Sequence, residues 1–514
     1  MMDATPLLRA YARRRLKRLA AEHPAQAQTR QLQRLLRSAR GTAFGAAHGF
    51  GRMTGVADFQ ANVPLRRYED FWREWWQPSF PTVRNATWPG TIPYFAATSG
   101  TTTGNTKYIP VSRQMMASNR SAALDILVHH LAVRPDSRIL AGRSFMLGGS
   151  TDLVRQAPGI YSGDLSGIAA NAVPRWAQPR YFPPRALALI ADWDRKTDLL
   201  AELSLRTDIR CISGTPSWVL PFFGKLAALR PDRPARSQSW YPNLELFIHG
   251  GINFAPYRAQ FQDIFAGSHV DMREVYPASE GFIAIADGAY GEGLRLILDN
   301  GLFLEFVPVE EIGSAAPTRH WVANVQRDVN YAVVVSSNAG LWAYVLGDTV
   351  RFVDLQPPRV LITGRLSYSL SAFGEHLIGE EIEAAIQQAA RWVGARVMES
   401  TVAPVYPAEP QAPGGHHFVI EPSVVAGATD WAGFASVLDR ALAVENADYA
   451  AHRVGMRAPT LTVVAPGTFA AWMRHRGKAG GQNKVPRVIN DEALFADLRA
   501  FVTEPGRTLA CVNG

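Results

Sequence analysis

The segment 98–107, TSGTTTGNTK, has the composition of a loop that binds an anion. Glycine lets the backbone approach a ligand closely, hydroxyl groups donate hydrogen bonds, and the lysine ammonium supplies positive charge. The spacing differs from that of a Walker A loop, and a surface loop without a ligand is the alternative interpretation. We predict that the phosphate-binding residues are Thr98, Ser99, Gly100, Thr101, Thr102, Gly104 and Lys107.

Lysine is rare in this chain, since only six of its 53 basic residues are lysines. A lysine inside a glycine-rich stretch therefore indicates that a compact ammonium group is needed there. Lys107 and Lys484 fit this description, whereas Lys196 and Lys225 have the surroundings of ordinary surface residues.

Two further motifs place a carboxylate near small residues. In YPASEG (276–281), Tyr276 can stack on a nucleotide base, and Ser279 can donate a hydrogen bond to a phosphate oxygen. Glu280 can bind a Mg²⁺ ion that the phosphates of the nucleotide also bind. A helix N-terminus is the alternative interpretation of this motif. In YVLGD (344–348), Asp348 follows the expected end of a strand and can accept two hydrogen bonds from a ribose. A turn aspartate is the alternative there.

The dipeptide Gly250–Gly251 follows an apolar strand pattern in LELFIHGG (244–251). Bare backbone at this point lets a flat adenine or acyl group lie against the chain. The same letters occur in the oxyanion hole of lipases, but the sequence contains no G-x-S-x-G nucleophile motif. We therefore predict a binding role and not a hydrolase site.

The composition is that of a soluble protein with two or three domains: 514 residues, 47% hydrophobic, net charge +8. No apolar run is long enough to cross a bilayer, so no membrane span is expected. The N-terminal segment is typical of a basic amphipathic helix, and a solvated helix face is favoured over membrane or nucleic-acid binding. Two distant cysteines indicate the cytoplasm. We expect a monomer without a nucleic-acid partner.

Strand patterns followed by helices at 209–229 and 244–281 predict an α/β fold, in which ligands bind beyond the carboxyl ends of the strands. Short strands joined by turns follow residue 300, and the stretch 364–376 is a candidate hinge. Beyond it, helices and strands alternate and the last element is a helix. We predict a large N-terminal domain over 1–370 and a small α+β domain over 371–514.

Six motifs in order resemble those of the Gretchen Hagen 3 family of acyl acid–amido synthetases, within the acyl-adenylate-forming enzymes. The resemblance runs from about residue 40 to 490, and this chain is similar to a bacterial-type member. In chain order, the motifs are FQANVPLRRYEDF (59–71), TSGTTTGNTK (98–107), NLELFIHGG (243–251), YPASEGFIA (276–284), GLWAYVLGDTVRF (340–352) and GQNKVPR (481–487).

The resemblance implies a luciferase-like architecture, in which a large α/β domain with a β-barrel-like subdomain carries a small mobile C-terminal domain. It implies that ATP and Mg²⁺ are bound, with Glu280 as the metal ligand. The loop around Lys484 would swing over the active site and neutralise charge as the carboxylate attacks the α-phosphate. Arg365 would contact ribose or phosphate. Plant members have a lysine just beyond the hinge, where this chain has His376.

We therefore expect a ligase that adenylates a carboxylic acid and transfers the acyl group to an amine, such as an amino acid. The catalytic residues are Lys484 and Lys107. A coenzyme A ligase and a catalytically silent nucleotide-binding protein are the alternatives. The predicted nucleotide site adds to the 98–107 loop the residues Gly250, Gly251, Tyr276, Ala278, Ser279, Glu280, Asp348 and Arg365.

Overall fold

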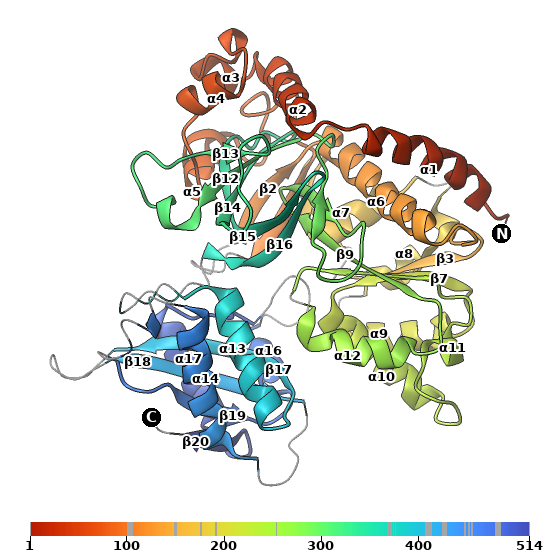
Figure 1. Ribbon diagram of the computed structural model, residues 1–514. Helices are drawn as coiled ribbons and strands as arrows, with labels where there is room; N and C mark the ends of the chain where they lie inside the picture. Colours follow the sequence, from red (N-terminus) through yellow and green to blue (C-terminus); the bar gives the residue numbers. More distant parts are fainter. Residues whose placement is uncertain are drawn as a thin grey trace. The chain divides into compact units, whose positions relative to one another are not determined.

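The computed structural model describes most of the chain (Figure 1). The described residues are 2–512 except 100–105, 149–151, 175–176, 191–192, 253, 367–369, 371–372, 374, 376, 407–413, 424–428, 447–448, 451–452, 454–455 and 478–484. They form two units. The large unit contains Met1–Thr98, Thr106–Leu346 and Val350–Leu361, and the small unit contains Gly347–Thr349 and Ile362–Gly514. The domain boundary at residue 370 stays a prediction.

A twelve-stranded sheet forms the centre of the large unit, in the order β13-β12-β14-β15-β16-β11-β10-β9-β8-β7-β3-β6. Its strands are β3 (Arg143–Leu147), β6 (Tyr181–Phe182), β7 (Ile209–Gly214), β8 (Leu246–Gly250), β9 (Asp271–Ala278), β10 (Gly281–Ile285), β11 (Leu294–Leu296), β12 (Leu302–Pro308), β13 (His320–Trp321), β14 (Asn330–Ser337), β15 (Tyr344–Leu355) and β16 (Pro358–Arg365).

The sheet has a parallel and an antiparallel half. Strands β6, β3, β7, β8 and β9 are parallel, whereas β9–β10, β10–β11, β11–β16 and β12–β14 are antiparallel pairs. The resemblance implies a β-barrel-like subdomain without giving its bounds, and the strands after residue 300 join the parallel strands through β11, β10 and β9. Within the described residues they are therefore part of one open sheet and not a separate closed barrel.

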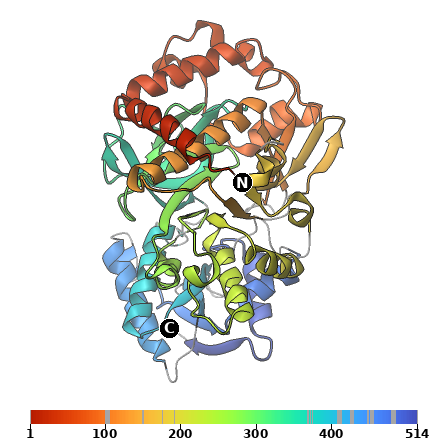
Figure 2. The same cartoon turned by 90° about the vertical axis from the view of Figure 1, so that its right-hand side faces the viewer.

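Helices cover both faces of the parallel half. On one face, α6 (Arg113–Val133) packs on Cys211, Leu246 and Val275, and α1 (Thr5–Ala20) lies beside α6 (Figures 1 and 2). On the other face, the Phe247 ring of β8 stacks on the Phe261 ring of α12 (Ala255–Phe265). The remaining helices of the large unit are α2 (Pro24–Ala39), α3 (Ala43–Ala47), α4 (Val56–Asn62), α5 (Tyr68–Phe71), α7 (Leu165–Asn171), α8 (Arg185–Ala188), α9 (Trp193–Ser204), α10 (Pro216–Leu229) and α11 (Ser237–Trp240).

A second sheet of the large unit has the order β2-β1-β5-β4. Its strands are β1 (Tyr94–Ser99), β2 (Thr106–Val111), β4 (Val154–Ala157) and β5 (Ile160–Gly163). The predicted phosphate loop connects the neighbouring strands β1 and β2. Its residues 100–105 lie outside the described residues.

The small unit is a four-stranded sheet with helices on both faces. Its strands are β17 (Val397–Val405), β18 (Gly415–Pro422), β19 (Thr460–Val464) and β20 (Thr508–Val512). Helices α13 (Gly379–Trp392) and α14 (Trp431–Glu445) pack on one face, and α16 (Thr468–His475) and α17 (Glu492–Val502) on the other. The expectation that the chain ends in a helix was wrong, because β20 follows α17 and pairs with β19 along the sheet edge.

No helix in the described part of the chain is both long and apolar enough to span a bilayer.

Candidate active site

The carboxyl ends of β7, β8 and β9 meet at one edge of the sheet, because these three strands are parallel neighbours. Gly250 ends β8 and Ala278 ends β9. We refer to this edge, with Gly250, Gly251, Ser279 and Glu280, as the carboxyl edge. It brings two of the predicted motifs together.

Gly250 is required by the sheet itself. An added Cβ would lie 2.3 Å from the carbonyl oxygen of Val275, its neighbour in register on β9. Gly251 has a φ of +85°, a conformation that side chains disfavour. The close approach of β9 therefore requires glycine at position 250, and the sequence pattern alone did not reveal this contact.

Ser279 and Glu280 form the turn between β9 and β10. Gly281 pairs directly with Ala278, so the connection is a two-residue hairpin. This geometry excludes the helix N-terminus that was the alternative interpretation of YPASEG. Glu280 is only 9% exposed although it lies in a turn. A buried carboxylate beside backbone is a candidate ligand for a cation that phosphates share.

Three side chains gather on the face of β8 and β9 that carries Tyr276. Tyr276 is buried, and Glu274 lies two residues before it on the same face. Burial raises the pKa of Glu274 to about 7. His249 is the register partner of Glu274, and burial lowers its pKa to about 3.

The His249 ring stacks on Phe254 at a centroid distance of 3.8 Å, and its Nδ1 has no hydrogen-bond partner among the described residues. Sequence reasoning missed His249 and Glu274. Their positions, next to Gly250 and two residues before Tyr276, were the available signal.

Lys107 is the second residue of β2 and contacts α5. Its Nζ lies 3.1 Å from Glu69 Oε1 and 5.1 Å from the centre of the Tyr68 ring. Helix α5 therefore positions the ammonium group at the carboxyl end of the predicted phosphate loop. For Thr98 and Ser99 the structure describes the backbone in β1 but not the side chains.

Asp348 in β15 and Arg365 at the end of β16 form an ion pair, with 2.7 Å between Oδ1 and Nε. The expectation that Asp348 ends a strand was wrong, since β15 continues to Leu355. Gly347 has a φ of +93°, and the strand continues through it. The pair joins two of the predicted nucleotide-binding residues.

Lys484 and His376 lie outside the described residues. The end of the Lys-x-Pro-Arg motif is described. Arg487 Nη1 lies 2.8 Å from Glu399 Oε2, and the Arg487 carbonyl accepts a hydrogen bond from the Val402 amide at 3.1 Å. Strand β17 therefore fixes the chain three residues beyond Lys484.

Lys196 is not an ordinary surface residue. It is 3% exposed, and its ammonium donates to the carbonyls of Gly148 and Ala188. Burial lowers its pKa. These carbonyl contacts are tertiary, so no local sequence pattern predicts them.

No group of three or more histidine, cysteine, aspartate or glutamate side chains that could hold a metal occurs among the residues that the structure describes. A single carboxylate such as Glu280 fits Mg²⁺, which proteins bind through one or two carboxylates together with substrate phosphates.

Three family models match the chain in order. They are the GH3 family N-terminal domain at residues 14–147, the central domain at 295–365 and the C-terminal domain at 380–493. Together they span more than half of the chain.

Curated relatives match shorter segments. A human GH3 domain-containing protein is 32% identical over 130 residues, 24% of each chain. An indole-3-acetic acid-amido synthetase, GH3.8 of Oryza sativa subsp. indica, is 29% identical over 211 residues, 38% of this chain and 34% of its own length. The matches thus span about a quarter to a third of these relatives.

Solved structures share the fold over nearly the whole chain. A GH3.15 acyl acid amido synthetase superposes with a TM-score of 0.78 at 17% identity, covering 96% of this chain and 95% of its own. A 2-hydroxyisobutyryl-CoA ligase in complex with its adenylate superposes with a TM-score of 0.61 at 15% identity, covering 93% and 91%. The three ordered domain matches establish the family, and the chain belongs to the GH3 family.

Proposed function

We propose that this chain is an ATP-dependent ligase that adenylates a carboxylic acid and transfers the acyl group to an amine, such as an amino acid. Membership of the GH3 family supports this proposal most strongly. The geometry of the carboxyl edge agrees with it, because a buried carboxylate in a hairpin turn lies at the edge where parallel sheets bind ligands.

Each predicted residue has a defined part in this proposal. Glu280 holds Mg²⁺, which would screen the phosphate charge that repels the attacking carboxylate. Lys107 and the loop before it bind phosphate oxygens, and Tyr276 packs against the base. Asp348 accepts hydrogen bonds from the ribose hydroxyls. Arg365, whose Nε lies 2.7 Å from Asp348 Oδ1, orients that carboxylate. Lys484 stabilises the charge that develops at the α-phosphate.

Measurement of pyrophosphate release from Mg-ATP tests this function. A panel of carboxylic acids is assayed with mixed amino acids, with coenzyme A and with neither. Release that requires an acid and accelerates with amino acids is the expected result. Acceleration by coenzyme A alone would assign the chain to thioester-forming ligases, and ATP binding without turnover of any acid would make it a silent nucleotide-binding protein.

Two substitutions test the residue assignments. Lys484→Ala and Asp348→Ala are expected to abolish acid-dependent pyrophosphate release while the chain stays folded. Lys225→Ala and Asp198→Ala are matched controls, because these residues form an ion pair with each other at 2.7 Å in the large unit. Full activity of either test variant would reject that residue's role.

We also propose that the protein works in the cytoplasm as a monomer. The cysteines support the first statement, since Cys211 and Cys511 are both free thiols. Gel filtration with light scattering measures the oligomeric state, and the mass of a monomer is expected.

A further inference from the structure

Helix α1 is held to the large unit along one face. Leu8 and Ala12 are buried in the same core cluster as residues of α6, and Leu19 is buried as well. The Arg15 guanidinium is neutralised by Asp125 and Asp299, each at 2.6 Å. This inner face of α1 therefore has its apolar and its charged side chains satisfied.

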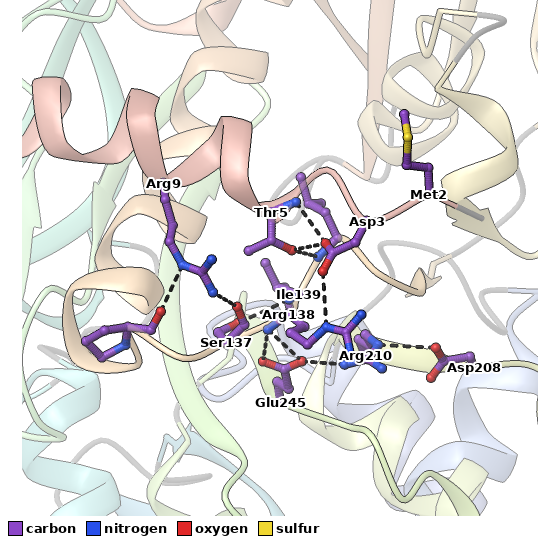
Figure 3. Close-up of polar contacts among 12 residues, drawn as sticks. Met2, Asp3, Thr5, Arg9, Ser137, Arg138, Ile139, Asp208, Arg210 and Glu245 are labelled. Atoms are coloured by element: carbon purple, nitrogen blue, oxygen red, sulfur yellow. Dashed lines mark hydrogen bonds and ion pairs between the residues drawn. The ribbon is translucent and has the colours of Figure 1, made fainter.

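The start of α1 is fixed by polar contacts (Figure 3). Asp3 accepts hydrogen bonds from Thr5 and pairs with Arg138 at 3.1 Å. Arg9 donates to the carbonyls of Pro135 at 2.9 Å and Ser137 at 2.7 Å. The helix thus has a single orientation on the large unit, and its outer face has a defined composition.

We call this outer face the basic face, and it consists of Leu7, Tyr11, Arg13, Arg14, Lys17 and Arg18, all exposed. Helix α1 contains no aspartate or glutamate. Within the part of the chain that the structure describes, Arg13, Arg14 and Lys17 have no ion-pair partner, and Arg18 approaches only Asp299, at 3.5 Å. Four cations therefore face solvent with little neutralisation.

Apolar side chains accompany these cations. Leu7 is 77% exposed and Tyr11 is 40% exposed, one turn apart on α1. On the neighbouring helix α6, Leu124 and Val133 are also exposed. Large apolar side chains that protrude among cations are typical of helices that lie at a lipid interface.

We propose that the basic face binds the surface of a membrane that contains anionic lipids. The cations attract the headgroups, and Leu7 and Tyr11 enter the headgroup region. A nucleic acid would use the cations but has no place for an exposed leucine, so the apolar residues favour lipid. The proposal concerns peripheral binding, and it is independent of the reaction proposed above.

Vesicle flotation tests this proposal. The full chain is mixed with vesicles of phosphatidylglycerol and phosphatidylcholine, or of phosphatidylcholine alone, at about 0.1 M and about 0.5 M salt. We expect binding only to the anionic vesicles, and less at the higher salt. Each cation contributes about fivefold in affinity, so R13A/R14A/K17A is expected to lose about 100-fold.

Two matched variants separate a defined surface from general charge. R391A/R396A/R440A removes three exposed arginines from the small unit and is expected to lose less than about fivefold. L7N/Y11N is expected to weaken vesicle binding but to leave binding of duplex DNA unchanged. V444N, at an exposed apolar position of α14, is expected to change neither.

Three results would overturn the proposal. They are no binding to anionic vesicles at the lower salt, an equal loss in the small-unit triple variant, or tighter binding to duplex DNA than to the vesicles. Circular dichroism of every variant must match the parent, so that a loss cannot be assigned to unfolding.

Discussion

The parallel strands of the large unit end at two edges that are built differently. At the carboxyl edge, Gly250 and Gly251 follow β8, and Ser279 and Glu280 follow β9. At the opposite edge, which we call the amino edge, β7, β8 and β9 begin at or directly after a carboxylate: Asp208, Glu245 and Asp271. The carboxyl edge carries two glycines, a serine and a buried glutamate, and the amino edge carries carboxylates with charged partners.

The amino-edge carboxylates are bound by the protein itself. Glu245 accepts from Arg210 at 2.9 Å and from the Arg138 amide (Figure 3), and Asp271 pairs with Arg273 at 2.8 Å. Burial lowers the pKa of His130, but its hydrogen bonds to Asp271 and Glu245 outweigh this and raise the pKa overall. Carboxylates therefore hold the beginnings of the strands in place at the amino edge, whereas Glu280 at the carboxyl edge is proposed to bind Mg²⁺.

The largest expected effect is a difference in activity between a substitution at the carboxyl edge and one at the amino edge. Glu280→Gln is expected to lower acid-dependent pyrophosphate release by about 100-fold or more, because the metal loses its carboxylate. The matched variant Glu245→Gln, at the amino edge, is expected to keep its activity at 25 °C and to lose about 2 kcal/mol of unfolding free energy. Steady-state kinetics and urea titration measure both. If Glu245→Gln lost as much activity as Glu280→Gln, the two edges would not differ in function.

A second prediction concerns the glycine of the carboxyl edge. Gly250→Ala places a methyl group 2.3 Å from the Val275 carbonyl oxygen, so it is expected to destabilise the large unit by about 3 kcal/mol. Gly224→Ala is the control, since this position in α10 has nothing within 4 Å of the added methyl, and it is expected to stabilise by about 0.5 kcal/mol. Thermal unfolding compares them. Equal midpoints would show that β8 can move away from β9 without cost.

The order of elements and the motif positions could be predicted from the sequence, because strand patterns and glycine-rich turns are local signals. The strands around 209–214, 246–250 and 302–308 fall where the patterns placed them. The short edge strand β20 was missed, because an edge strand of alternating burial has a weak apolar signal.

The details of the site depended on contacts that are remote in sequence. Glu280 lies in a hairpin turn because Gly281 pairs with Ala278, and YPASEG alone is equally compatible with a helix start. Asp348 lies inside β15, since strand pairing continues past Gly347. His249 and Glu274 become neighbours only through the register of β8 and β9. Register is a tertiary property, so no local pattern reveals it.

A third prediction uses the opposite pKa shifts of two glutamates. Burial raises the pKa of Glu274, near the carboxyl edge, to about 7. At the amino edge, burial acts against ionisation of Glu245, but hydrogen bonds from His130, Ser137 and Arg210 outweigh it and lower the pKa to about 2. Glu274 therefore costs stability as the pH rises from 4.5 to about 7, whereas the contribution of Glu245 is lost as the pH falls from 4.5 to about 2.

Glu274→Gln removes a carboxylate that ionises at a cost in the folded state. At pH 8 this variant is expected to be more stable than the parent by up to about 3 kcal/mol, and near pH 4 the two are expected to be equal. Glu245→Gln is expected to be less stable than the parent at pH 8, because it removes a carboxylate whose charged form the folded state stabilises. Urea titrations of the three proteins across this pH range measure the differences. A pH-independent difference for Glu274→Gln would mean that its carboxyl group is hydrated in the folded protein, and the contrast between the edges would then rest on Glu280 alone.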